Sequence, residues 1–187
     1  MEYISSDTNV WVDFMTIGRM ELPFRLPYRY IMWEETITEE FLTPEWFRET
    51  MLACGLKSVE ITIEEFMLAE EYGSKYIKLS VHDRIALAIA KERNITLLTG
   101  DGALRKAANK ERVKVMGTLA IMDKLHDGNY IDDEEFCKCL ERLEVHNGGI
   151  IRLPKEEIAA RLEKVNKKYS ETRKKLRVFI VVLWCRI

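Results

Sequence analysis

Residues 80–102 read S-V-H-D-R-I-A-L-A-I-A-K-E-R-N-I-T-L-L-T-G-D-G. Ser80 and Asp83 stand at the spacing of a helix capping box, with Asp in place of the usual Glu, and they predict a helix start. The apolar run over 95–99 is typical of a short buried strand. Asp101 follows that run and precedes the helix-like A-L-R-K-A-A. A helix, a buried strand and a second helix in succession favour an α/β fold.

The same alternation extends over most of the chain. Further β-prone segments lie at residues 1–6, 28–33, 58–61 and 113–116, and helix-like segments separate them. Strands that alternate with helices argue for βαβ units and a parallel sheet, because right-handed crossovers place helices on both of its faces. The sequence therefore predicts a three-layer α/β/α fold with a central parallel sheet.

Local signals predict where several helices begin and end. Thr36 is expected to cap the short acidic stretch I-T-E-E-F-L, and Thr43 is expected to cap a helix that has proline at its first position. Thr62 is expected to start a helix that Gly73 ends. A further helix is expected from Asp132, and Pro154 is expected to open a long polar helix.

Charge divides the chain into two predicted parts. Residues 155–187 carry 10 Lys or Arg and 4 Asp or Glu, whereas residues 1–154 carry 19 and 27, which together give the net charge of −2. We expect one domain over residues 1–150 and a helical basic extension with an apolar tail over 151–187. A basic extension suggests contact with a polyanion or an acidic partner, and a solvated amphipathic helix is the alternative.

Composition excludes several classes of protein. No apolar run approaches the roughly 18 residues of a membrane-spanning helix, and the first residues lack the charged and apolar regions of a secretory signal. A cytoplasmic location with no membrane contact is expected, and the four cysteines are expected to be reduced thiols. The cysteines and the three histidines show neither zinc-site spacing nor a nucleophile–base arrangement.

Four acidic residues are candidates for one shared site. Asp7 and Asp101 follow predicted strands, Glu40 follows the second strand on a short helical turn, and Asp83 lies in the first turn of a helix. The carboxyl edge of a parallel sheet is where ligands bind. Each residue alone is also explained as a cap, a turn residue or a solvated acid. If they converge, their mutual repulsion requires a cation, and Mg²⁺ prefers carboxylate oxygens.

These pieces together resemble the PIN-domain nucleases. The resemblance rests on I-S-S-D-T-N-V-W-V, I-T-E-E-F-L, K-L-S-V-H-D-R-I-A-L-A-I-A-K, L-L-T-G-D-G-A-L-R-K-A-A and V-K-V-M-G-T-L, in this order over residues 3–125. It implies the family fold and cleavage of single-stranded RNA with Mg²⁺ or Mn²⁺. Many prokaryotic members are toxins of toxin–antitoxin pairs and form dimers, so RNA, an antitoxin protein and a second copy of the chain are the implied partners.

The resemblance also assigns roles to individual residues. Asp7, Glu40, Asp83 and Asp101 fall on the four acidic metal-ligand positions, which are also the catalytic positions, and Glu39 competes with Glu40 for its place. Two polar residues fall on positions that support the acids through hydrogen bonds. These are Asn9 and Thr99.

The chemistry suits these residue types. A divalent ion lowers the pKa of a water and neutralises charge on a phosphodiester, and we expect products with a 3′-hydroxyl and a 5′-phosphate. RNA also needs positive charge on its approach, for which the candidates are Arg84, Arg105 and Lys106.

Two alternatives share the acidic cleft. One is a non-catalytic PIN-like module that binds RNA or a protein, and the other is a structure-specific DNA nuclease. A nucleotide-binding α/β domain of another type is disfavoured, because the chain lacks both a G-x-x-x-x-G-K-[ST] loop and a G-x-G-x-x-G turn after the first strand.

Overall fold

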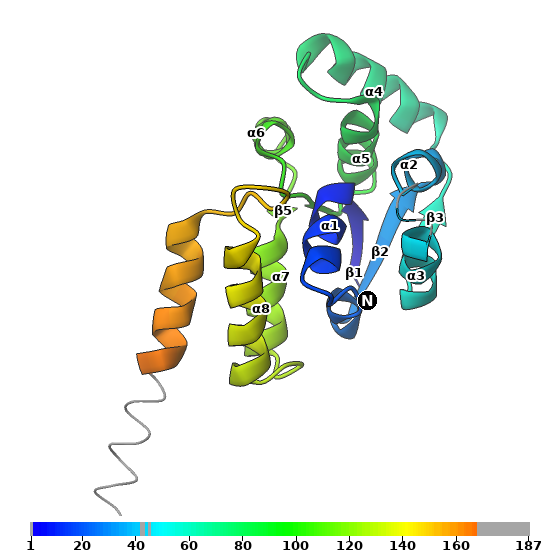
Figure 1. The fold of residues 1–187 in the computed structure, drawn as a ribbon. Coiled ribbons are helices and arrows are strands. Elements are labelled where there is room, and N and C mark those ends of the chain that lie inside the picture. The colour runs from blue at the N-terminus through cyan, green and yellow to red at the C-terminus, as the bar shows by residue number, and fades with distance from the viewer. Residues whose placement is uncertain (1, 42–43, 45, 168–187) are drawn as a thin grey trace, which may run out of the picture. The chain divides into compact units, whose positions relative to one another are not determined.

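The structure is a computed structural model that describes residues 2–41, 44 and 46–167. The chain divides into two compact units, Met1–Tyr130 and Ile131–Ile187. The elements of the first unit (Figure 1) are β1 (Glu2–Ser6), α1 (Thr8–Thr16), the 3₁₀ helix η1 (Leu22–Arg25), β2 (Tyr28–Trp33), α2 (Glu34–Glu40), α3 (Trp46–Cys54), β3 (Lys57–Val59), α4 (Ile63–Lys75), α5 (Val81–Glu92), β4 (Thr96–Leu98), α6 (Gly102–Lys110), β5 (Val115–Met116) and α7 (Thr118–Asp127).

The strands form one sheet in which every pairing is parallel. In the described part of the chain it has five strands in the order β3-β2-β1-β4-β5. Ile4 on β1 pairs with Tyr30 on one side and with Thr96 on the other. The chain first builds outward from β1 through β2 and then reverses to add β4 on the opposite side. In open parallel sheets, ligands bind at the carboxyl edge where the strand order reverses, which is here the edge between β1 and β4.

Helices cover both faces of the sheet, as predicted. The Ser5 hydroxyl donates to the carbonyl of Ala86 on α5 (2.9 Å), while the Ser6 hydroxyl accepts from the Trp11 indole on α1 (3.2 Å). Because successive residues of a strand point to opposite faces, α5 and α1 lie on opposite sides of the sheet. Helices α4 and α6 pack on α5, and α7 packs on α1. The three-layer α/β/α prediction is therefore confirmed.

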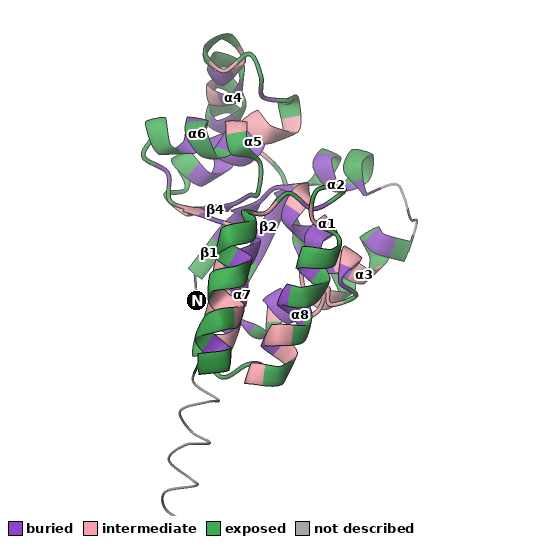
Figure 2. Ribbon diagram, turned by 60° about the vertical axis from the view of Figure 1, so that its left-hand side comes forward, coloured by how far each residue is buried: buried purple, intermediate pink, exposed green. Residues whose placement is uncertain are grey.

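Each face of the sheet has its own apolar core. On the α5 side, every residue from Ile85 to Ala90 is buried, because α5 has the sheet on one side and α4 and α6 on others. This is the expected pattern for a helix enclosed all round. On the α1 side the core is aromatic: the rings of Trp11, Phe24 and Tyr30 lie with their centroids 5.0–5.4 Å apart. Figure 2 shows the burial along these strands and helices.

The second unit is helical in its described part. Helix α8 (Asp133–Val145) has Asp132 as its N-cap, as predicted. The side chain of Asn147 then bonds both the carbonyl (2.7 Å) and the N–H (3.0 Å) of Leu153, which shapes the connection to a helix over residues 155–167. The predicted continuation of that helix and the apolar tail over 178–187 lie outside the described residues. No helix in the described part is long and apolar enough to cross a membrane.

Two predicted helix ends are wrong, each because a distant contact decides the local structure. Helix α2 begins at Glu34 after Trp33, and Thr36 lies buried inside it instead of capping it. Helix α4 runs on to Lys75, so Gly73 does not end it. A Cβ on Gly73 would lie 2.0 Å from Nη1 of Arg84, which shows that this glycine makes room for a neighbouring side chain.

Candidate active site

Asp7 lies at the carboxyl end of the central strand and is held by several hydrogen bonds. Its carboxylate oxygen Oδ1 accepts the backbone N–H of Thr8 (2.6 Å), and Oδ2 accepts the hydroxyl of Thr99 (2.7 Å) and the amide of Asn9 (2.5 Å). Its own N–H donates to the carbonyl of Leu98 on β4 (3.0 Å). Asp7 is therefore fixed between the carboxyl ends of β1 and β4, and only 8% of its surface is exposed.

The surroundings of Asp7 disfavour its negative charge. Burial raises the pKa of Asp7 to about 7, the hydrogen bonds from Thr99 and Thr8 oppose that shift, and the negative charges of Asp83 and Glu40 add to it. A charge effect of this kind requires the acids to be near one another. Asp83 and Glu40 therefore lie near enough to Asp7 to add to the shift, although burial is its largest cause.

Glu40 and Glu39 have different partners, although they are adjacent on α2. The Thr8 hydroxyl donates to Oε2 of Glu40, which ties the end of α2 to the start of α1. Glu39 instead lies 3.2 Å from Nε2 of His82 and is largely exposed. The contact with Thr8 and the effect on Asp7 place Glu40 at the acidic site, whereas Glu39 belongs to a separate contact.

His82 is a site-shaping residue that sequence reasoning missed. Its Nδ1 lies 2.9 Å from the hydroxyl of Thr36, and its ring packs against Trp33 with the centroids 5.8 Å apart. With the Glu39 contact, His82 joins α2 to the N-terminus of α5, and Asp83 is the next residue. A lone histidine with no ligand spacing gave no signal of this role.

Asp83 forms the capping box that its spacing predicts. Its Oδ2 accepts the N–H of Ser80 (2.8 Å), and the Ser80 hydroxyl accepts the N–H of Asp83 (3.1 Å). The carboxylate is therefore held at the start of α5. Because α5 packs across β1, β2 and β4, its first turn brings Asp83 close enough to act on the charge of Asp7.

Asp101 is the N-cap of α6. Its Oδ1 accepts the N–H groups of both Ala103 and Leu104 (2.8 Å each), and its own N–H donates to the hydroxyl of Thr99 (3.0 Å). Asp101 is not among the charges that shift the pKa of Asp7. The Thr99 hydroxyl, which donates to Asp7 and accepts from Asp101, is the link between these two residues.

Asn9 joins the segments that follow β1 and β4. Its amide nitrogen donates to Asp7 (2.5 Å), and its amide oxygen accepts the N–H of Gly100 (2.7 Å). Asn9 and Thr99 thus contact the same carboxylate oxygen of Asp7, and each also contacts the segment that leads into α6. Both residues orient Asp7 through direct hydrogen bonds.

The three predicted phosphate-binding cations lie in different settings. Nη1 of Arg105 donates to the carbonyl of Thr99 (3.1 Å), next to Gly117, where an added Cβ would lie 3.0 Å from that nitrogen. Arg105 therefore stands beside the site. Arg84 bonds the carbonyl of Ser80 (3.2 Å) and lies against Gly73 on α4. Lys106 is exposed on α6.

The side chains present suit a hard divalent cation in chemistry. Asp7, Glu40 and Asp83 offer carboxylate oxygens, which Mg²⁺ and Mn²⁺ favour, and a cation would offset the negative charges of Asp83 and Glu40 that add to the pKa shift of Asp7. Over residues 2–41, 44 and 46–167, no three or more His, Cys, Asp or Glu side chains are placed together so as to hold a metal ion. The metal-ligand roles of the four acids stay predictions.

Comparison with known proteins identifies the family. A family model described as the PIN domain matches residues 3–167, which is most of the chain. No curated protein and no solved structure matches the chain. PIN domains are generally nucleases and typically depend on divalent metals. The parallel sheet, its order and the acidic residues at its carboxyl edge agree with that match, and the chain belongs to the PIN-domain nuclease family.

Proposed function

We propose that this chain is a divalent-metal-dependent endoribonuclease that hydrolyses phosphodiester bonds of single-stranded RNA. The observation that carries the proposal is the position of Asp7. It is a buried carboxylate at the reversal point of a parallel sheet, and its pKa is raised to about 7 by burial and by two neighbouring acids. A buried acid that gathers further acids costs stability unless a bound cation offsets them.

The residues take the following roles in this proposal. Asp7, Glu40 and Asp83 hold Mg²⁺ or Mn²⁺, and Asp101 completes the set from the start of α6. When bound, the divalent ion supplies an activated water and neutralises charge on the phosphate. Asn9 and Thr99 keep the Asp7 carboxylate oriented.

Arg105 is the first of the phosphate-binding residues in this proposal. Its guanidinium is anchored by one nitrogen to the carbonyl of Thr99, so its other donors can face a phosphate that enters the edge of the sheet. Lys106 extends the positive charge along α6. Arg84 contributes from the first turn of α5, beside Asp83.

The direct test is cleavage of labelled single-stranded RNA by the full chain with Mn²⁺. We expect cuts that leave a 5′-phosphate and a 3′-hydroxyl, that stop in excess EDTA, and that disappear in the Asp7→Asn, Asp101→Asn double variant. Cleavage that continues in EDTA would remove the metal from the proposal. Parallel incubation with single-stranded and branched DNA tests the DNA-nuclease alternative, and binding without cleavage of any substrate would favour the non-catalytic module.

Glu39 and Glu40 offer a matched pair of variants. Glu40→Gln should abolish cleavage, because Glu40 contacts Thr8 and acts on Asp7. Glu39→Gln changes the same charge one residue away and keeps a hydrogen-bonding side chain near His82, so it should retain most activity. Equal loss in both variants would refute the assignment of Glu40, and not Glu39, to the site.

We further propose that the protein acts in the cytoplasm as the toxin of a toxin–antitoxin pair and as a homodimer. The exposed apolar residues Ile63, Phe66 and Met67, spaced along one face of α4, support a contact with a protein. Expression should slow growth, and the Asp7→Asn, Asp101→Asn variant should not; equal arrest by both would exclude catalysis as the cause.

Met67→Glu should convert a dimer into a monomer in light scattering, and an unchanged mass would exclude α4 from the interface.

A further inference from the structure

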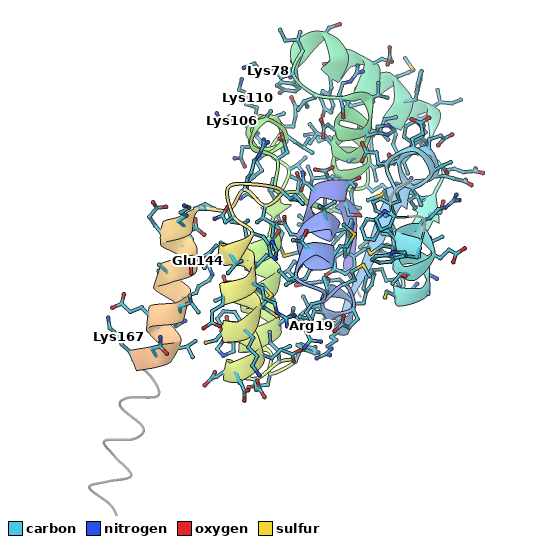
Figure 3. All side chains as sticks on the ribbon, viewed as in Figure 1. Arg19, Lys78, Lys106, Lys110, Glu144 and Lys167 are labelled. Carbon is cyan, nitrogen blue, oxygen red and sulfur yellow. The ribbon has the colours of Figure 1, made fainter. Side chains whose placement is uncertain are left out.

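We infer that a lysine stripe, formed by Lys78, Lys106 and Lys110, binds the phosphates of the RNA strand outside the acidic site. The inference rests on the proposed function, in which single-stranded RNA is the substrate. Figure 3 shows the three side chains projecting from the same edge of the first unit, from α6 and from the connection between α4 and α5. Within the described residues, the ammonium groups of Lys78 and Lys106 form no ion pair or hydrogen bond.

The local charge is strongly positive, although the whole chain carries −2. Residues 75–78 and 102–114 contain one acid, Glu111. The basic residues of these two segments are Lys75, Lys78, Arg105, Lys106, Lys110, Arg112 and Lys114.

Glu111 does not neutralise the stripe, because it has its own partners. Its Oε1 lies 2.7 Å from Nζ of Lys75 and accepts the hydroxyl of Tyr76 (2.5 Å). The Lys110 ammonium lies 5.8 Å from the centre of the Tyr76 ring. This contact places the end of α6 beside the connection that carries Lys78, so the two segments form one surface.

The stripe is continuous with the candidate active site. Helix α6 starts at its N-cap Asp101, whose N–H bonds the same Thr99 hydroxyl that contacts Asp7. Lys106 and Lys110 are four residues apart and therefore share one face of α6. At 1.5 Å per residue, Lys110 lies about 13 Å along the helix from Asp101.

Electrostatics explains why such a surface is needed. Gathered carboxylates repel an RNA strand at the point of cleavage, so the free energy of binding must come from cations that contact the flanking phosphates. Three exposed ammonium groups in a row contact a flexible polyanion without reading its sequence. An acidic peptide is the other polyanion that such a surface could bind, and the experiment below includes it.

The test measures binding without cleavage, by fluorescence anisotropy of labelled oligouridine on the full chain in EDTA. The stripe variant is Lys78→Gln, Lys106→Gln, Lys110→Gln. The control variant, Arg48→Gln, Lys57→Gln, Lys124→Gln, removes the same charge at exposed positions on α3, β3 and α7. Lys124 lies 5.8 Å from the Tyr28 ring centre, so it matches Lys110 in its aromatic contact. Circular dichroism confirms that both variants fold.

We expect the stripe variant to bind an oligonucleotide of about sixteen residues about tenfold more weakly than the unmodified protein, and the control variant to bind it within about twofold. The slope of log affinity against log salt should fall by about 2 in the stripe variant, because each single-strand phosphate contact contributes about 0.7.

Three results would overturn the inference. These are a stripe variant that binds the long RNA as tightly as the unmodified protein, an equal loss in the control variant, and binding of polyglutamate as tight as that of RNA at the same salt. Cleavage with Mn²⁺ is scored separately. If the unmodified protein does not cleave RNA but the stripe variant binds it more weakly, the nuclease proposal alone is refuted. If the unmodified protein cleaves RNA and the stripe variant binds it as tightly, the stripe alone is refuted.

Discussion

Replacing Asp7 by Asn should remove most of the loss of stability that the metal-free protein shows as pH rises. Burial, with the charges of Asp83 and Glu40, raises the pKa of Asp7 from 3.8 to about 7 in the folded state. Between those values the folded state binds more protons than the unfolded chain, so the free energy of unfolding falls as pH rises from about 4 to about 7. A shift of about three pKa units corresponds to about 4 kcal/mol.

The Asp7→Asn side chain would carry no charge at any pH, but it would lose part of the hydrogen bonding of Asp7. An amide nitrogen in place of Oδ2 would face the Asn9 amide, which is itself a donor, at a cost of about 1 kcal/mol. The Asp7→Asn variant should therefore be less stable than the unmodified protein by about 1 kcal/mol near pH 4. It should be more stable by about 3 kcal/mol near pH 8.

The assay is urea unfolding in EDTA, followed by tryptophan fluorescence, since Trp11 is fully buried in the core beside α1. Asp13, whose pKa burial raises to about 6 against the Thr118 hydrogen bond, titrates in both proteins and cancels in the difference. Asp127→Asn, at a largely exposed position, is the control. Mg²⁺ should restore stability near pH 8 only to the protein that retains Asp7. A difference in stability that is the same at both pH values would refute the reasoning.

Three further predictions follow from the contacts. Asn9→Ala should lower cleavage about 10- to 100-fold, because the Asp7 carboxylate loses an orienting bond; an unchanged rate would show that Thr99 alone suffices. His82→Ala should lower kcat in steady-state kinetics and lower the free energy of unfolding in urea by about 1–2 kcal/mol. His82→Gln should recover part of both losses, and no recovery would argue against the Thr36 contact. Glu65→Ala should lower the free energy of unfolding in urea by about 3 kcal/mol, because Arg93 loses the carboxylate to which it donates two hydrogen bonds. A loss below about 1 kcal/mol would mean that water replaces the carboxylate.

Much of the fold could be predicted because its signals are local. The capping box of Ser80 and Asp83, the buried strand after Asn94 and the acid at the start of α6 all depend on residues within a few positions of one another. Strand and helix alternation then limited the topology to a parallel sheet. The failures at Thr36 and Gly73 share one cause, because partners 46 and 11 residues away, His82 and Arg84, decide the local structure.

The candidate site was predictable in composition but not in detail. Position at strand ends indicated which acids could meet. For Glu40 and Asp83 the structure agrees, because their charges add to the raised pKa of Asp7. The sequence could not separate Glu40 from Glu39, since their difference lies in contacts with Thr8 and His82. Nor could it tell whether the acid at the start of α6 serves only as a helix cap or also as a metal ligand, because both look alike in a sequence.

The two outer strands limit how this protein can assemble. Strand β3 has three residues and β5 has two, and exposed lysines lie at or beside them, Lys57 on one and Lys114 before the other. Short, charged edge strands leave few free N–H and C=O groups with which a strand of another molecule could pair. The sheet of the described residues should therefore resist growth into fibrils through its edges, and contacts between copies of this part of the chain should be made by helices.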